Sequence, residues 1–191
     1  MLPSAVPVAE PSPEELAALS EEERERVRAS LERRARMTGE EMGYGILQST
    51  RPQTLAYALH DSPVGQLAWI VEKFQAWTDC EELPEEAVDR DRLLTDVTLY
   101  WLTGTANSSA RLYYEAAHAG AGWAALATAP STTPTGVAVF PHDTSLAVRH
   151  LAERDNRIEH WSELDRGGHF PAMEVPDLLV ADLRAFFRRV R

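Results

Sequence analysis

The chain has 191 residues, of which 44% are hydrophobic, and this is enough for one domain with a buried core. Nineteen basic against thirty acidic residues give a net charge of −11, which argues against nucleic acids and anionic membranes as partners because both require a basic surface. The single cysteine excludes an internal disulfide and agrees with a cytoplasmic location, and no apolar run reaches the roughly 18 residues of a membrane span.

The first part of the chain predicts helices. Residues 1–11 contain three prolines and are expected to form an extended leader. Two capping boxes follow, each a serine with a glutamate three positions later: Ser12 with Glu15, and Ser20 with Glu23. The second precedes a charged helix expected over residues 21–36, where Val27 and Leu31 form a narrow apolar stripe.

Helical spacing continues to residue 118. A helix opens at Pro63 and runs to about Trp77, with apolar residues at steps of three and four. After an acidic loop, two further helices are expected over residues 93–103 and 108–117, with a hinge at Gly104. The sequence therefore predicts one helical region over residues 12–118.

The pattern then changes to that of an α/β fold. Residues 119–135 are expected to form a connecting loop, and residues 136–191 to form strand–helix–strand–helix. The strands are predicted at residues 136–140, an apolar run ended by Pro141, and at residues 157–164. Because two strands are too few for a stable sheet with both faces covered, part of a domain is expected to be missing.

Two polar residues follow the predicted strands. Asp143 comes directly after the first strand, and His169 follows the second in the sequence Gly-Gly-His-Phe. In open α/β sheets the loops beyond the carboxyl ends of the strands gather at one edge, so these side chains can meet. The acid would then orient the imidazole, which would act as a base. Asp165 is a competing acid, and a solvated histidine with a turn-forming aspartate is the alternative interpretation.

Four stretches of the sequence together resemble microsomal-type epoxide hydrolases. In chain order they are residues 42–78, residues 93–115, PTGVAVFPHD at 134–143 and RGGHFPAMEVPDLL at 166–179. They occur in the family's order and at compatible spacing. The most specific of them contains Asp61-Ser62-Pro63-Val64-Gly65, followed by Trp69 to Phe74.

The resemblance implies a partial α/β-hydrolase fold, in which a helical cap precedes the last strand–helix–strand–helix of the core. The family converts an epoxide and water to a vicinal diol through an ester on an aspartate, without a metal or organic cofactor. By position, His169 matches the base that activates water and Asp143 the acid that orients it. Tyr44 and Tyr113 match the tyrosines that bond the epoxide oxygen, with Tyr114 as the alternative if the alignment shifts by one residue.

Two elements of the family pattern do not occur in these 191 residues. They are the nucleophilic aspartate within Gly-x-Asp-x-Gly and the His-Gly-rich segment of the oxyanion hole. Asp61 is no substitute, because the resemblance places it in the cap. The chain is therefore expected to be a C-terminal portion of an epoxide hydrolase, inactive alone. Its expected partners are a small hydrophobic epoxide and either a complementary N-terminal half or further copies of itself.

Two other functions remain open. One is a non-catalytic binding protein or decayed pseudoenzyme derived from this family. The other is a different α/β-hydrolase reaction, such as ester or haloalkane hydrolysis. The second alternative does not need a pair of phenols at the leaving oxygen, so Tyr44 and Tyr113 argue against it.

Overall fold

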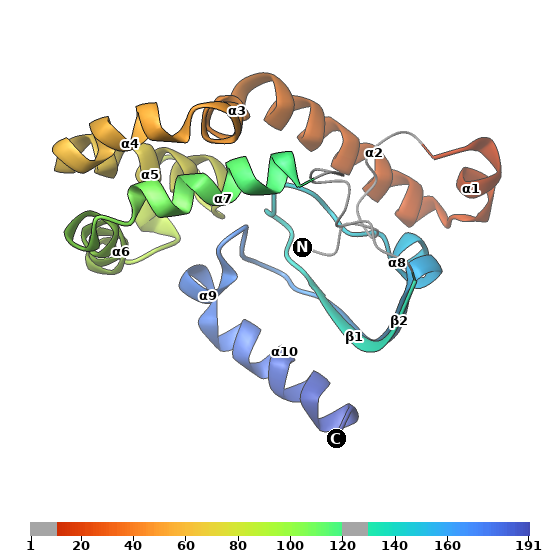
Figure 1. Cartoon of the computed structure of the whole chain (residues 1–191). Helices are drawn as coiled ribbons and strands as arrows, with labels where there is room; N and C mark the ends of the chain where they lie inside the picture. Colours follow the sequence, from red (N-terminus) through yellow and green to blue (C-terminus); the bar gives the residue numbers. More distant parts are fainter. Residues whose placement is uncertain (1–10, 120–129) are drawn as a thin grey trace. The chain divides into compact units, whose positions relative to one another are not determined.

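Helices dominate the computed structural model, which describes residues 11–119 and 130–191 (Figure 1). The first part holds α1 (Pro13–Ala18), α2 (Glu21–Arg36), the π-helix η2 (Met37–Glu41), α3 (Gly43–Thr50), α4 (Pro52–Asp61) and α5 (Pro63–Trp77). It continues with the 3₁₀-helix η3 (Pro84–Glu86), α6 (Arg90–Thr103) and α7 (Ala106–His118). The last part holds β1 (Ser131–Val139), α8 (Arg149–Asp155), β2 (Asn156–Glu163), α9 (Pro171–Glu174) and α10 (Pro176–Arg189). In the described part of the chain, no helix is long and apolar enough to cross a membrane.

The predicted helix starts are confirmed by their hydrogen bonds. The Ser12 hydroxyl accepts the backbone N–H of Glu15 at 3.2 Å, and the Glu15 carboxylate accepts the backbone N–H of Ser12 at 2.8 Å. Ser20 and Glu23 form the same reciprocal pair at the start of α2. These bonds satisfy backbone donors that the first turn of a helix leaves without partners. The predicted hinge at Gly104 is also confirmed, because this residue ends α6 in the left-handed conformation at φ +64°.

β1 and β2 form a two-stranded parallel sheet. Val137 lies opposite Trp161 and Val139 opposite Glu163, and the backbone N–H of Leu164 donates to the carbonyl of Val139 at 2.9 Å. A parallel pair requires a crossover, which includes α8. The expected strand–helix–strand–helix order is therefore confirmed.

The sequence interpretation placed the start of the first strand too late. β1 begins at Ser131, so residues 131–135 belong to the strand and not to a connecting loop. Thr132, Thr133 and Thr135 are β-branched and favour extended backbone, whereas Pro134 cannot donate to the ladder and coincides with a register shift. Residues 120–129, the rest of the expected connection, lie outside the described residues, as does the expected leader except Pro11.

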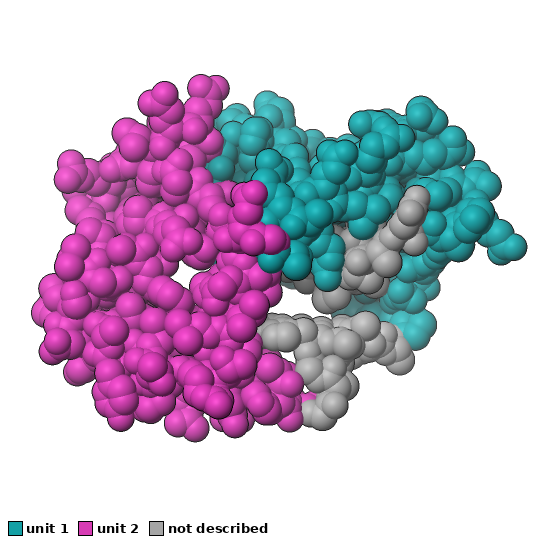
Figure 2. Space-filling view, turned by 90° about the horizontal axis from the view of Figure 1, so that it is seen from above, with its two compact units in different colours: residues 1–38, 77–79, 127–191 teal, residues 39–76, 80–126 magenta. Residues whose placement is uncertain are grey.

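The chain divides into two compact units (Figure 2). Unit 1 comprises the described residues within 1–38, 77–79 and 127–191, and unit 2 those within 39–76 and 80–126. Unit 1 therefore joins α1 and α2 to the sheet, whereas the sequence interpretation assigned both helices to one helical region over residues 12–118. The physical reason is burial, since the apolar stripe of α2 packs against the loop and helix between the strands. The buried cluster consists of Leu19, Val27, Val148 and Leu151, with Leu16 and Leu31 against it.

Unit 2 has its own apolar core, in which α3 and α4 pack against α7. Leu55 and Leu59 of α4 are buried with Ala106 of α7, and Leu47 and Trp69 pack against them. The small Ala106 and Ala110, both buried, let α7 approach its neighbours closely. This packing fixes α3 beside α7, and these two helices carry the two tyrosines singled out in the sequence.

Candidate active site

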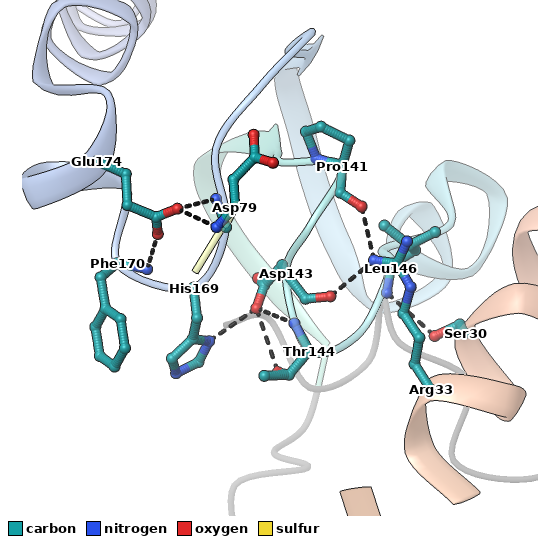
Figure 3. Close-up of polar contacts among 11 residues, drawn as sticks. Ser30, Arg33, Asp79, Pro141, Asp143, Thr144, Leu146, His169, Phe170 and Glu174 are labelled. Atoms are coloured by element: carbon teal, nitrogen blue, oxygen red, sulfur yellow. Dashed lines mark hydrogen bonds and ion pairs between the residues drawn. The ribbon is translucent and has the colours of Figure 1, made fainter. Parts of the chain in front are cut away.

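The structure brings Asp143 and His169 together in unit 1 (Figure 3). Asp143 lies in the loop after β1, and His169 in the loop between β2 and α9. The Nδ1 atom of His169 lies 2.8 Å from Oδ1 of Asp143. The same carboxylate oxygen accepts the backbone N–H of Thr144 at 2.7 Å and its hydroxyl at 3.2 Å. The aspartate is thus held in place by its neighbour as well as by the histidine.

The carboxylate is in its charged form near neutral pH. Burial raises the pKa of Asp143, but the hydrogen bond and charge of His169, together with the hydrogen bonds from Thr144, outweigh it and hold the pKa below its ordinary value. A charged acceptor at Nδ1 keeps a proton on that nitrogen. Among the residues that the structure describes, only Nδ1 of this ring has a hydrogen-bond partner. Nε2 is therefore the nitrogen that can accept a proton from water.

Asp165, the competing acid in the sequence, does not contact His169. Its side chain is 82% exposed and forms an ion pair of 3.8 Å with Arg166. The loop therefore directs this carboxylate to solvent, and Asp143 is the acid at the imidazole.

The two glycines before His169 are required by the loop that carries it. Gly167 has φ +100°, and a Cβ there would lie 2.7 Å from a methyl group of Val175. A Cβ on Gly168 would lie 2.6 Å from the carbonyl oxygen of Trp77. The next backbone N–H, that of His169, donates to this same carbonyl at 2.8 Å. The loop is thus pressed against residues 77–79, and only glycine leaves room for this contact.

Glu174 is the clearest residue that the sequence interpretation missed (Figure 3). Its Oε2 accepts the backbone N–H groups of Asp79 and Gly168, each at 2.8 Å, and its Oε1 accepts that of Phe170 at 2.7 Å. One carboxylate therefore binds the amides on both sides of His169. No capping box marks Glu174 in the sequence, because Phe170 at the N-cap has no side-chain acceptor and Glu174 lies four positions after it instead of three.

Asp79 and Trp77 complete the support of this loop. Asp79 accepts the backbone N–H of Gly167 at 2.8 Å and lies 3.3 Å from Nε2 of His142. The indole of Trp77, which is 9% exposed, meets the imidazole of His169 edge to face with centroids 5.2 Å apart. The sequence left four tryptophans without a role: Trp69, Trp77, Trp101 and Trp123, the last outside the described residues. In the structure Trp77 lies beside His169.

Helix α2 anchors the loop that carries Asp143 (Figure 3). The guanidinium of Arg33 donates to the carbonyl oxygens of Pro141 at 2.7 Å and Asp143 at 2.8 Å. The hydroxyl of Ser30, which is fully buried, accepts the backbone N–H of Leu146 at 3.2 Å. These three bonds give partners to backbone groups that lie in the loop after β1 and are not hydrogen-bonded within the sheet.

The two tyrosines lie side by side in unit 2. Tyr44 comes from α3 and Tyr113 from α7, and their rings meet edge to face with centroids 5.7 Å apart. Burial, followed by the neighbouring Tyr113, raises the pKa of the Tyr44 phenol. A neutral phenol is a hydrogen-bond donor at physiological pH. Tyr114, the alternative, stacks instead on His118 with centroids 4.1 Å apart.

A histidine and an acid in the loops after two neighbouring parallel strands are the arrangement expected of a segment of the α/β-hydrolase class. Within residues 11–119 and 130–191, no group of three or more histidine, cysteine or acidic side chains could hold a metal ion. No family model matches the chain.

Over its whole length the chain is 43% identical to a putative epoxide hydrolase of Stigmatella aurantiaca, covering 40% of that protein. It is 40% identical over 153 residues to epoxide hydrolase 1 of Sus scrofa, covering 34% of it. The solved structure of Aspergillus niger epoxide hydrolase matches with a TM-score of 0.74 and 31% identity, over 97% of this chain and 44% of that one. The chain belongs to the family of microsomal-type epoxide hydrolases and spans about 40% of the length of the relatives it matches.

Proposed function

We propose that this chain is the part of an epoxide hydrolase that supplies the base and the oxygen-binding tyrosines, and that it hydrolyses no epoxide by itself. The observation that carries the proposal is the 2.8 Å hydrogen bond between His169 and Asp143. A histidine held by a carboxylate at Nδ1 is a general base at Nε2. The substrate class, small hydrophobic epoxides, is taken from the family.

The reaction has two covalent steps. A carboxylate outside these 191 residues attacks one epoxide carbon, the C–O bond of the ring breaks, and an ester forms. The ring oxygen takes a proton from a tyrosine hydroxyl and becomes the first hydroxyl of the diol. His169 then removes a proton from water, and the resulting hydroxide attacks the ester carbonyl. The carboxylate is released, and the imidazolium of His169 gives its proton to the departing alkoxide, which becomes the second hydroxyl of the diol. The remaining proton from water restores the tyrosine hydroxyl. Asp143 stabilises the imidazolium formed when His169 takes the proton, and its lowered pKa keeps it charged for this task.

Tyr44 and Tyr113 act in the first step. An epoxide oxygen becomes a good leaving group only when hydrogen bonds stabilise its developing negative charge. The edge-to-face pair brings two phenols together, and burial keeps Tyr44 neutral and able to donate. By analogy with the loss of one oxyanion donor, each Tyr→Phe change is expected to slow ring opening by an amount on the order of 2–4 kcal/mol in activation free energy.

The first experiment uses the chain alone. Incubation with styrene oxide should give no diol above the buffer rate. Diol formation that disappears in His169→Ala would overturn the proposal, because it would require a nucleophile within the 191 residues.

The second experiment restores the missing part. The matching segment of the Stigmatella aurantiaca relative, which this chain aligns with over its full length, is replaced by this chain. The chimera should form diol, and its His169→Gln variant should stall at the ester, which mass spectrometry detects as a stable adduct. Asp143→Asn should give a weaker stall, and the matched control Asp165→Asn none. Normal turnover in His169→Gln would mean that the base lies elsewhere.

One observation favours a second candidate, a non-catalytic binding protein. The 191 residues contain no Gly-x-Asp-x-Gly stretch, so they can hold an epoxide only without opening it covalently. If the chimera is inactive and the isolated chain binds styrene oxide in calorimetry, with loss of binding in Tyr44→Phe, this candidate becomes the better one.

A further inference from the structure

A buried lysine lies against the ring of Tyr44. Lys73, on α5 in the same unit, is 9% exposed, and its Nζ lies 5.1 Å from the centroid of the Tyr44 ring. A cation at this distance from an aromatic face is attracted by the ring's quadrupole. The ammonium of Lys73 and the phenol ring of Tyr44 therefore interact electrostatically.

Two glutamates hold the ammonium. Nζ donates to Oε2 of Glu41 at 2.8 Å and to Oε1 of Glu72 at 2.6 Å. The Glu41 side chain is 24% exposed and that of Glu72 61%, so Glu41 is the partner within the structure and Glu72 the partner at its surface. Burial lowers the pKa of Lys73, but the hydrogen bonds and charges of both glutamates outweigh it and hold the pKa above its ordinary value. The lysine is therefore charged throughout the physiological range.

Packing alone gives no reason for a charge at this position. Apolar residues of similar volume often replace a buried ion pair without loss of stability. The charge does have a reason if it acts on its aromatic neighbour. Among the described residues, Tyr113 from α7, Glu41 from η2 and Lys73 from α5 lie beside Tyr44, and of these three Lys73 carries the positive charge.

We propose that Lys73 is a positioning residue for Tyr44, whose ammonium, held by Glu41 and Glu72, strengthens the phenol as a hydrogen-bond donor to the substrate oxygen. A positive charge beside the ring stabilises the electron density that a phenol gains when it gives up its proton. Glu41 has the opposite effect on the phenol and limits the gain. This inference rests on the proposed function only for its last step, the benefit to ring opening.

The electrostatic part is tested in the 191-residue chain, without any epoxide. Tyr44 is replaced by 3,5-difluorotyrosine, whose phenol is more acidic than that of tyrosine and so ionises while Lys73 is still charged. The ¹⁹F resonance is then followed against pH to give the midpoint of this ionisation. Lys73→Met should raise the midpoint by roughly half a pH unit or more. Lys73→Arg, which keeps the charge, should restore it. Glu41→Gln should lower the midpoint, and Glu40→Gln, an exposed neighbour on η2, should not move it.

The decisive result is that the two variants move the ionisation midpoint of the phenol in opposite directions. If Lys73 and Glu41 had only a structural role, Lys73→Met and Glu41→Gln would move this midpoint in the same direction. An unchanged midpoint in Lys73→Met, or equal signs, would overturn the electrostatic inference. The last step is tested in the chimera, where Lys73→Met should slow ester formation several-fold and Lys73→Arg should restore it. Normal ester formation in Lys73→Met would overturn the benefit to ring opening. An inactive chimera, by contrast, would count against the proposed function and leave the phenol shift as measured.

Discussion

The Nδ1 atom of His169 lies 2.8 Å from Oδ1 of Asp143, although the two residues are 26 positions apart. The pKa of this aspartate is held below its ordinary value of 3.8 by the bond. A carboxyl group whose pKa is lower in the folded state than in the unfolded chain makes its full contribution to stability at pH values above its unfolded pKa. That stabilisation is lost as the pH falls through the lower, folded pKa.

The first prediction concerns the acid dependence of stability. At pH 6 Asp143→Asn should lower the free energy of unfolding by about 1–2 kcal/mol, because the charged acceptor of His169 and Thr144 becomes neutral. Below pH 4 the difference from the unaltered chain should shrink. Urea unfolding at pH 6 and pH 3 measures both values. Asp165→Asn, whose side chain is 82% exposed, should change neither by more than about 0.5 kcal/mol.

The second prediction concerns the glycine before His169. Gly168→Ala should destabilise the chain by roughly 2 kcal/mol or more, because its Cβ would lie 2.6 Å from the Trp77 carbonyl, a backbone atom. Gly39→Ala is the matched control, since a Cβ there meets nothing within 4 Å and alanine favours helical backbone. Chemical denaturation compares the two variants. Equal stability of Gly168→Ala and the unaltered chain would show that the loop can move away from residues 77–79.

The third prediction concerns Glu174. Glu174→Ala removes the acceptor of three backbone N–H groups and should cost on the order of 2–4 kcal/mol. The backbone amides of Gly168 and Phe170 should then exchange with solvent much faster, as measured by hydrogen–deuterium exchange. Asp177→Asn is the control, because Asp177 is 67% exposed and pairs only with Arg166 among the described residues. Unchanged exchange at both amides in Glu174→Ala would contradict the role assigned to this carboxylate.

The fourth prediction concerns the contact between α2 and β2. The hydrogen bond from Arg26 lowers the pKa of Glu163 to about 2, against the opposing effect of burial. A ¹³C NMR titration of the Glu163 carboxyl should therefore give a midpoint near that value, and Arg26→Gln should move it towards the ordinary 4.5. Arg28→Gln, which removes an exposed partner of Glu25, should leave it in place. An ordinary midpoint in the unaltered chain would mean that Arg26 of α2 does not pair with Glu163 at the end of β2.

Features that depend on a few neighbouring residues were predictable from the sequence. The capping boxes at Ser12 and Ser20 and the hinge at Gly104 are confirmed because their hydrogen bonds and backbone angles arise within one helical turn. The first strand was predicted from a short apolar run and the second at residues 157–164, and their ends placed an acid and a histidine in neighbouring loops. The sequence therefore determined the order of the elements and the candidate pair Asp143 and His169.

Other features were decided only by the path of the chain in space. Asp143 rather than Asp165 meets the imidazole because the loop after β2 turns Asp165 to solvent. Helix α2 joins the unit that holds the sheet because Val27 is buried with Val148 and Leu151, more than 100 positions later. Glu174 reaches the amide of Asp79 across 95 positions. Apolar side chains can be buried, and backbone groups can be hydrogen-bonded, by residues at any distance along the sequence. No local pattern of residues therefore specifies which distant partners will meet.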